Sequence, residues 1–243
     1  MADLSAFPIT RRWPAKHADR LQLYSLPTPN GVKVSIALEE LGIPYEPHTI
    51  NIGANETWTE EFLSLNPNGK IPAIIDPDGP GGKPLGLFES GAILLYLAEK
   101  TGKLLPKDAA HRYETIEWVF FQMASIGPMF GQVGFFHKFA GREYEDKRPL
   151  QRYVTESKRL VGVLEGRLRG RPCSAGSISR SGRKRRLREG TSLREFDRGL
   201  ILCYRDPPRI PRAVAEERRS LKALEREQRL HHSPYGRRDA TLR

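Results

Sequence analysis

The sequence has 243 residues, of which 38% are hydrophobic and 28% charged, and its formal net charge is +11. This length allows one large domain or two small ones with an ample core, and the composition is that of an ordinary soluble protein. No apolar run approaches the roughly 20 residues of a membrane span, the N-terminus lacks the apolar region of a signal peptide, and two separated cysteines, Cys173 and Cys203, favour a reducing cytoplasm over a disulfide framework.

The first twenty residues show no periodicity, and we interpret them as an extended N-terminal arm, with a disordered terminus as the alternative. Residues 21–26 predict a short β-strand. The sequence Pro-Thr-Pro-Asn-Gly at 27–31 then leads into a predicted helix, which Gly42 ends. One face of this helix is apolar and carries Val34, Ala37, Leu38 and Leu41.

Thr28 and Asn30 lie where this loop enters the helix. Oriented N–H and O–H donors at a helix N-terminus lower the pKa of a thiol, so both residues are candidates for stabilising a thiolate. The same residue types are also favoured simply as turn and cap residues. Both interpretations remain open from the residues alone.

A second strand at 45–52 and a short helix at 59–65 precede the stretch 66–100. Two apolar runs at 71–75 and 85–88 flank a Gly- and Pro-rich turn at 77–84, which predicts a β-hairpin. Pro72 lies at the start of the first of these strands, where proline is disfavoured because it cannot donate to the ladder. A cis Ile71-Pro72 bond would explain this position and leave the backbone of Ile71 free for an extended ligand.

The second strand of the hairpin runs into Glu89 and Ser90, with Ser90 as the predicted N-cap of a helix whose Ile93, Tyr96 and Leu97 share one face. Backbone amides at a helix N-terminus attract a carboxylate, and the Glu89 side chain can hold an amine. This pair is therefore suited to binding an amino acid by both of its charged groups.

From residue 106 the pattern is helical. A helix at 113–126 is predicted to turn a stripe of Ile116, Val119, Phe120, Met123 and Ile126 toward the core, and Gly127-Pro128 to break or kink it. Phe130, Phe135 and Phe136 follow at 129–139 and could line an acceptor site, although aromatic residues at this density are more often core. Another helix begins near Pro149 and carries Leu160 and Leu164.

These residues together resemble the glutathione transferases. Ile71-Pro72 followed by Glu89-Ser90 resembles their thioredoxin-like domain, and Thr28-Pro29-Asn30-Gly31 with the run from Asn66 to Ala73 is similar to the bacterial nu-class enzymes, which are glutathione-dependent disulfide reductases. The resemblance covers about residues 1–168. It implies a fold class of an α/β thioredoxin-like N-terminal domain followed by an all-α C-terminal domain that is incomplete here.

The resemblance also implies roles for single residues. Thr28 and Asn30 would hold the glutathione sulfur as the catalytic residues. Glutathione itself would be held by Lys70 at the glycyl end, by Ile71 and Pro72 along the cysteinyl backbone, by Glu89 and Ser90 at the γ-glutamyl end, and by Arg152 at a carboxylate. For Lys70 and Arg152 a solvated surface residue is the alternative. No metal site is predicted.

The predicted function is reduction of small disulfides by a protein-stabilised glutathione thiolate, in a cytoplasmic homodimer. Conjugation of glutathione to electrophiles is the alternative within enzymes, and a non-catalytic thioredoxin-like binding protein is the alternative outside them. The predicted organisation is an arm at 1–20, a glutathione-binding domain at 21–102, a partial helical domain at 108–168 and a tail at 169–243. The resemblance implies that the arm lies across the partner subunit, as it does in relatives. The physiological acceptor is not identified by the sequence.

The tail differs in composition from the rest of the chain. Residues 1–168 carry 19 Lys and Arg against 20 Asp and Glu, whereas residues 169–243 carry 21 against 9. The tail is too poor in apolar residues to form a core and predicts disorder with one charged helix near 211–230. We consider two origins, a frameshift in a GC-rich gene and a genuine Arg-rich nucleic-acid-binding segment. The tail lacks aromatic interleaving, which makes a nucleic-acid partner the weaker choice.

Overall fold

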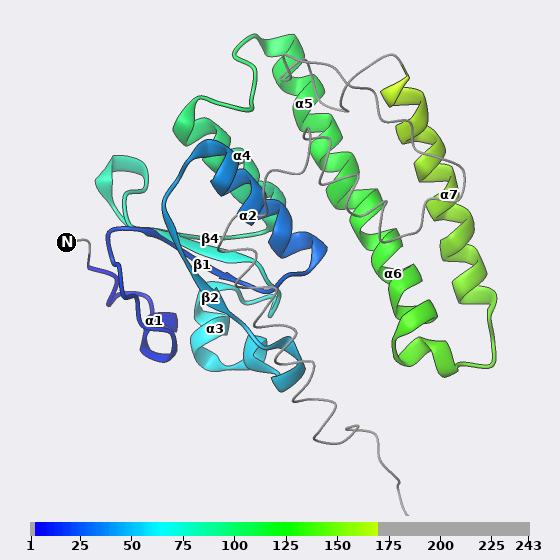
Figure 1. The fold of residues 1–243 in the computed structure, drawn as a ribbon, viewed down its shortest axis with the longest axis horizontal. Coiled ribbons are helices and arrows are strands. Elements are labelled where there is room, and N and C mark those ends of the chain that lie inside the picture. The colour runs from blue at the N-terminus through cyan, green and yellow to red at the C-terminus, as the bar shows by residue number, and fades with distance from the viewer. Residues whose placement is uncertain (1–2, 170–243) are drawn as a thin grey trace, which may run out of the picture.

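The computed structural model describes residues 3–169. Its centre is a four-stranded sheet of order β2-β1-β3-β4, built from β1 (Leu21–Ser25), β2 (Tyr45–Thr49), β3 (Ala73–Asp76) and β4 (Leu85–Phe88). β1 pairs in parallel with β2 and antiparallel with β3, and β3 pairs antiparallel with β4. A helical part follows the sheet (Figure 1). The predicted fold class, a thioredoxin-like α/β domain followed by a helical one, is confirmed.

Helices α2 (Pro29–Leu41) and α4 (Ser90–Thr101) cover one face of the sheet. Their predicted apolar faces pack as expected, with Val34 and Leu38 of α2 and Ile93 and Leu97 of α4 fully buried. Gly42 ends α2 in the left-handed conformation, with φ of 71°, as the sequence predicts.

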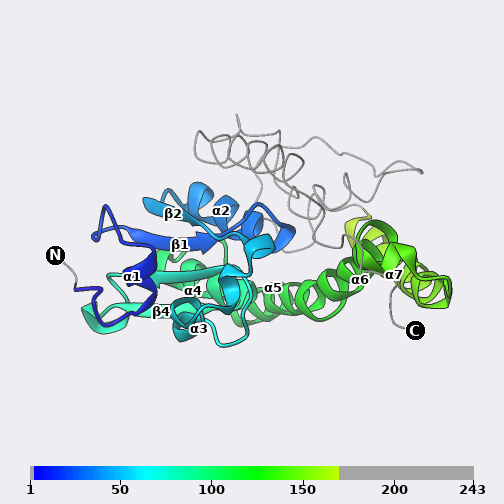
Figure 2. The same cartoon turned by 90° about the horizontal axis from the view of Figure 1, so that it is seen from below.

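The other face is covered by α3 (Glu60–Leu65) and by the N-terminal residues, which include the short helix α1 (Ile9–Arg12). Ile9 and Phe62 are fully buried there against Tyr24 of β1. The described arm residues thus pack onto the sheet of their own chain. In Figure 1 α1 and α3 lie below the strands, and in Figure 2, which is seen from that side, α1 lies in front of them.

A buried carboxylate fixes the end of the arm. The Oε1 and Oε2 atoms of Glu46 accept hydrogen bonds from the backbone N–H groups of Lys16 and His17, at 2.9 and 2.7 Å. Burial alone raises the pKa of the Glu46 carboxyl, but these two hydrogen bonds and the nearby imidazoles outweigh burial and hold its pKa below the usual 4.5. The arm is therefore attached to β2 by a charge-assisted contact.

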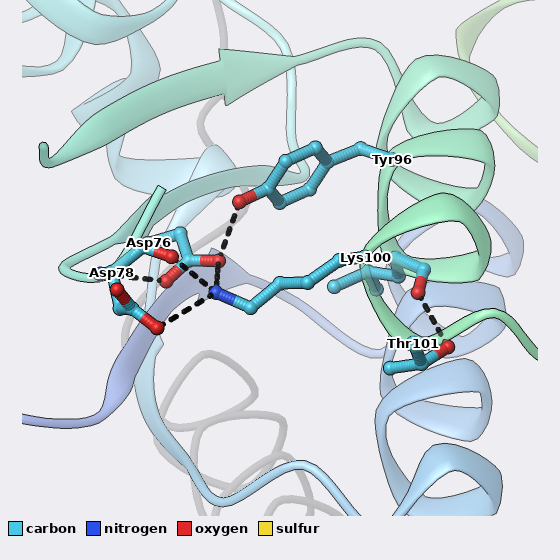
Figure 3. A network of polar contacts seen from close by, with 6 residues as sticks. Asp76, Asp78, Tyr96, Lys100 and Thr101 are labelled. Atoms are coloured by element: carbon cyan, nitrogen blue, oxygen red, sulfur yellow. Dashed lines mark hydrogen bonds and ion pairs between the residues drawn. The ribbon is translucent and has the colours of Figure 1, made fainter. Parts of the chain in front are cut away.

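A polar network attaches α4 to the hairpin (Figure 3). The buried carboxylate of Asp76, at the end of β3, accepts hydrogen bonds from Tyr96 Oη at 2.7 Å and from Lys100 Nζ at 2.8 Å. Lys100 also reaches Asp78 in the turn after β3. Burial, and then the hydrogen bond to Asp76, raises the pKa of Tyr96 well above its ordinary value. Because a buried carboxylate without partners is costly, the network fixes the C-terminal half of α4 relative to the sheet.

The helical part begins with one long, interrupted helix. α5 (Ala109–Phe121) passes through a π-helical turn, η4 (Gln122–Ile126), into α6 (Gly127–Lys138). Of the predicted break or kink at Gly127-Pro128, the break does not occur, because the chain stays helical, and the irregularity takes the form of this π turn. Proline lacks an N–H and its ring clashes with the carbonyl four residues earlier. The wider π turn immediately before Pro128 accommodates both effects without ending the helix.

The predicted buried stripe on this helix is only partly correct. Ile126 is buried, but Phe120 is 60% exposed, and Ile116, Val119 and Met123 are half-buried. By length and composition alone, Ala109–Lys138 could cross a membrane. One such helix is weak evidence for a span, since a core helix passes the same test.

Helix α7 (Arg148–Leu168) lies antiparallel beside α6 (Figure 1). Pro149 is in its first turn, as predicted. Leu160 and Leu164 are buried in a cluster with Ile126, and Phe136 of α6 stacks on Tyr153 with ring centroids 5.7 Å apart. The predicted tail, including its charged helix near 211–230, lies outside the described residues.

We predict that His48 makes stability depend on pH. Its ring stacks on Tyr24, with centroids 4.6 Å apart, and its Nε2 lies 2.8 Å from Gln22 Oε1. Burial lowers the pKa of His48 below the usual 6.5, and the nearby Glu46 only partly opposes this. The unfolded chain then binds more protons, so the contribution of His48 is complete above pH 6.5 and is lost as the pH falls toward its folded pKa.

Urea unfolding at about pH 7.5 and about pH 5.5 tests this. The urea midpoint of the wild type should be lower at the lower pH. His48→Phe keeps a ring on Tyr24 but cannot titrate, so it should be less stable at the higher pH and lose less stability as the pH is lowered. The exposed His137→Phe serves as control. An equal pH dependence in His48→Phe and wild type would contradict the prediction. Glu46 acts only below its usual 4.5, outside this window.

Candidate functional site

The register of the sheet brings three predicted site segments to one edge. Tyr24, near the end of β1, pairs with Ala73, the first residue of β3, and Ala73 pairs in turn with Phe88, the last residue of β4. The loop after β1, the segment before β3 and the residues after β4 must therefore lie side by side. These segments carry Thr28, Ile71-Pro72 and Glu89-Ser90.

Thr28 is the N-cap of α2, and its Oγ1 accepts a hydrogen bond from the N–H of Gly31 at 3.3 Å. A hydroxyl has one donor and two acceptor positions. The cap uses an acceptor position only, so the O–H of Thr28 can still donate toward a ligand. The capping role and the predicted thiolate role are thus compatible. Asn30 lies in the first turn of α2, where its side chain is exposed.

The peptide bond between Ile71 and Pro72 is cis, as the sequence suggested. β3 begins at Ala73 and not at Ile71, so Ile71 lies outside the ladder and Pro72 requires no strand partner. Within residues 3–169, no backbone hydrogen bond of Ile71 is formed. Lys70, just before it, is exposed, and its carbonyl accepts from Asn66 Nδ2.

Glu89 and Ser90 adopt a different arrangement from the one predicted. The N-cap of α4 is Glu89, without a side-chain cap, and Ser90 is the first helical residue. Glu89 has φ of 70° and ψ of 109°, a conformation that non-glycine residues rarely adopt. Strained backbone of this kind is concentrated at functional sites. The Glu89 side chain is exposed and Ser90 is buried.

The sequence pattern missed Met123 as a site residue. The π turn brings Met123 onto the N-terminus of α4, where Ser90 Oγ lies 3.6 Å from its sulfur. A Cβ on Gly91 would lie 2.9 Å from Met123 Cγ, so the absence of a side chain at 91 permits this approach. The helical part thus closes on the same edge of the sheet. A π turn cannot be recognised from periodicity, although Gly127-Pro128 marked its location.

Lys33 was also missed. Its Nζ lies 2.8 Å from Asn30 Oδ1, 3.0 Å from Gln122 Oε1 and 3.9 Å from Met123 Sδ. It therefore connects the first turn of α2 to the π turn of the helical part. The sequence placed Lys33 three residues after Asn30 on a predicted helix, but no local signal pointed to its contact with Gln122.

Arg152 is not brought to this edge by any contact within the described part of the chain. It is exposed on α7, where its charge acts on Glu156. His137 is likewise exposed. No group of three His, Cys, Asp or Glu residues that could hold a metal ion occurs among residues 3–169.

The sequence matches the family model of the glutathione S-transferase N-terminal domain over residues 19–99. It is also 43% identical, over 157 residues, to the disulfide-bond oxidoreductase YfcG of Escherichia coli, an alignment that covers 64% of this chain and 72% of YfcG. The chain belongs to the glutathione transferase family. It spans between 52% and 72% of the length of the first curated relatives that it matches.

Solved structures of glutathione transferases are also similar to this chain. A glutathione transferase from Burkholderia graminis, crystallised with two glutathione molecules per subunit, is 73% identical with a TM-score of 0.71, covering 72% of this chain and 73% of that one. A glutathione transferase from Pseudomonas putida, crystallised with one glutathione disulfide per subunit, is 55% identical with a TM-score of 0.71, covering 92% of this chain and 91% of that one.

Gly31 allows a test of how tightly the loop that carries Thr28 is packed. A Cβ on Gly31 would lie 2.1 Å from the carbonyl oxygen of Leu26, a backbone atom that cannot rotate away. We expect Gly31→Ala to lower the free energy of unfolding by about 1–3 kcal/mol and to displace Thr28, so that glutathione binding is lost too.

Denaturant unfolding and calorimetric titration with glutathione measure both effects. Gly162→Ala on α7, where a Cβ would meet nothing within 4 Å, is the matched control and should raise stability by about 0.5–1 kcal/mol. A Gly31→Ala variant as stable as wild type would show that the loop adapts.

Proposed function

We propose that this chain binds glutathione at the edge of the sheet and uses its thiolate to reduce small disulfides. The observation that carries the proposal is the convergence of the Thr28 cap, the free backbone of Ile71 and the Glu89-Ser90 helix start at one edge, in a chain of the glutathione transferase family. The predicted domain at 21–102 supplies all three.

In this proposal each end of the tripeptide has its own partner. The N-terminus of α4 and Ser90 hold the γ-glutamyl carboxylate, and the Glu89 carboxylate holds the α-amine. The N–H and C=O of Ile71 pair with the cysteinyl backbone as an added strand, and Pro72 orients Ile71. Lys70 receives the glycyl carboxylate. Arg152, exposed on α7, would contact a carboxylate only if a ligand or another subunit extends that far.

The chemistry needs no protein cysteine. The thiolate of one glutathione attacks one sulfur of the disulfide, which forms a mixed disulfide and releases the first thiolate of the acceptor. A second glutathione thiolate then attacks the glutathione sulfur, giving glutathione disulfide and the second thiol. Two glutathione molecules are oxidised for each disulfide reduced. Relatives crystallised with two glutathione molecules or with glutathione disulfide support this stoichiometry.

Thr28→Ala and Asn30→Ala should each slow glutathione-dependent reduction of a small dialkyl disulfide. Each removes a donor to a charged sulfur, and a hydrogen bond to a charged group contributes about 1.5–3 kcal/mol, or about 10- to 150-fold in rate. The measurement is kcat/KM for glutathione at a saturating concentration of the disulfide. Thr28→Ser is the positive control, because it keeps both the cap of α2 and the O–H donor and should retain activity.

Conjugation of the same thiolate to an aryl halide is the competing reaction and is assayed in parallel. Conjugation without disulfide reduction would refute the reductase. Folded wild-type protein that binds glutathione but does neither reaction would favour the non-catalytic binding protein.

We further propose a homodimer in the cytoplasm. Tyr113 and Phe120 on α5, 69% and 60% exposed, present apolar surface that a second copy could cover, and glutathione transferases are generally dimeric. Phe120→Asp should raise the dimer dissociation constant measured by analytical ultracentrifugation. Tyr113→Asp tests whether the interface extends to the N-terminal half of α5. A wild-type chain monomeric at all concentrations would refute the dimer, and cell fractionation tests the location.

A further inference from the structure

The contacts of Lys33 fix the direction of the Asn30 amide. An ammonium group only donates hydrogen bonds, while an asparagine amide has one acceptor oxygen and an NH₂ with two donors. Lys33 Nζ lies 2.8 Å from the Asn30 side chain. The group facing Lys33 must therefore be the oxygen, whichever way the amide is assigned. The NH₂ group then points away from Lys33.

A surface Lys–Asn pair three residues apart on a helix would by itself mean little. Lys33 differs because it has a second acceptor from a remote part of the chain, Gln122 Oε1 at 3.0 Å, and is half-buried beside Met123. Two oxygens from two elements restrain the ammonium. The restraint on Asn30 is accordingly stronger than a free lysine could impose.

We propose that Lys33 is a positioning residue for the glutathione thiolate. It holds the Asn30 oxygen so that the NH₂ donors remain available to the sulfur, and its charge polarises the amide and strengthens those donors. The docking of the π turn, through Gln122, is thereby coupled to the chemistry at α2. This inference rests on the proposed function.

Three variants of the full chain separate positioning from simple docking. Lys33→Met keeps the alkyl chain but removes the charge and the donors. Lys33→Arg keeps both, although the guanidinium differs in shape. Gln122→Met removes the hydrogen bond to Gln122 and leaves the contacts of Lys33 with Asn30 and Met123. For each variant we would measure the pH profile of kcat/KM for disulfide reduction and the thiolate absorbance of bound glutathione as a function of pH.

We expect Lys33→Met to move the apparent thiol pKa upward by about one unit, which is an about tenfold loss of thiolate at pH values well below that pKa. Lys33→Arg should restore most of this shift, and Gln122→Met should show less than half of it. A change in thermal stability or KM with an unmoved pH profile would mean that Lys33 only docks the helices, and would overturn the inference.

Lys33→Gln provides the same test if Lys33→Met does not fold. It retains a donor for the Asn30 oxygen without the charge, so a smaller shift in the same direction is expected, and no shift overturns the inference. Wild-type protein that does not bind glutathione would instead overturn the proposed function, and this inference with it. Wild-type activity with an unmoved profile in the Lys33 variants would overturn the inference alone.

Discussion

The pairing of Tyr24 with Ala73 and of Ala73 with Phe88 is the constraint on which the site depends. A slip of one residue in either antiparallel pair would turn the side chains of the shifted strand to the opposite face, and a slip of β3 would move Ile74 and Ile75 out of the separate cores that they fill. The hydrophobic pattern of three short strands therefore fixes the positions of the loop after β1, the segment before β3 and the residues after β4. No residue of the proposed site has to enforce this arrangement itself.

The helical part contributes to the same edge through a single turn of irregular helix. Met123 reaches Ser90 and, through Lys33, the start of α2. The two ends of α4 are thus fixed by different means, at Ser90 by the helical part and at Lys100 by the buried Asp76. The donors at the edge are held by packing from two sides, which is how a site with exposed polar residues remains ordered.

Elements with a strong local signal could be predicted from the sequence. Gly42 ended α2 and Pro149 opened α7, because their backbone preferences act within one or two residues. The first site residues were found for the same reason, since Thr28 and Pro72 carry local signatures. Lys33 and Met123 could not be found, because their roles arise from contacts about 90 and 33 residues apart in the chain. The conformation of Glu89 likewise depends on how β4 meets α4 and not on its neighbours in sequence.

The π turn at Gln122–Ile126 has a consequence for the history of this helix. A π turn holds about one more residue than a regular helical turn, and each residue of an α-helix rotates the chain by roughly 100°. Deleting one residue between Phe121 and Gly127 would therefore close the wide turn to a regular one and leave α6 facing in about the same direction. A deletion elsewhere in α5 or α6 would instead rotate everything beyond it by about 100°, and the aromatic residues that meet α7 would then face elsewhere. A one-residue deletion is therefore less disruptive to the orientation of α6 at these five positions than elsewhere along this helix.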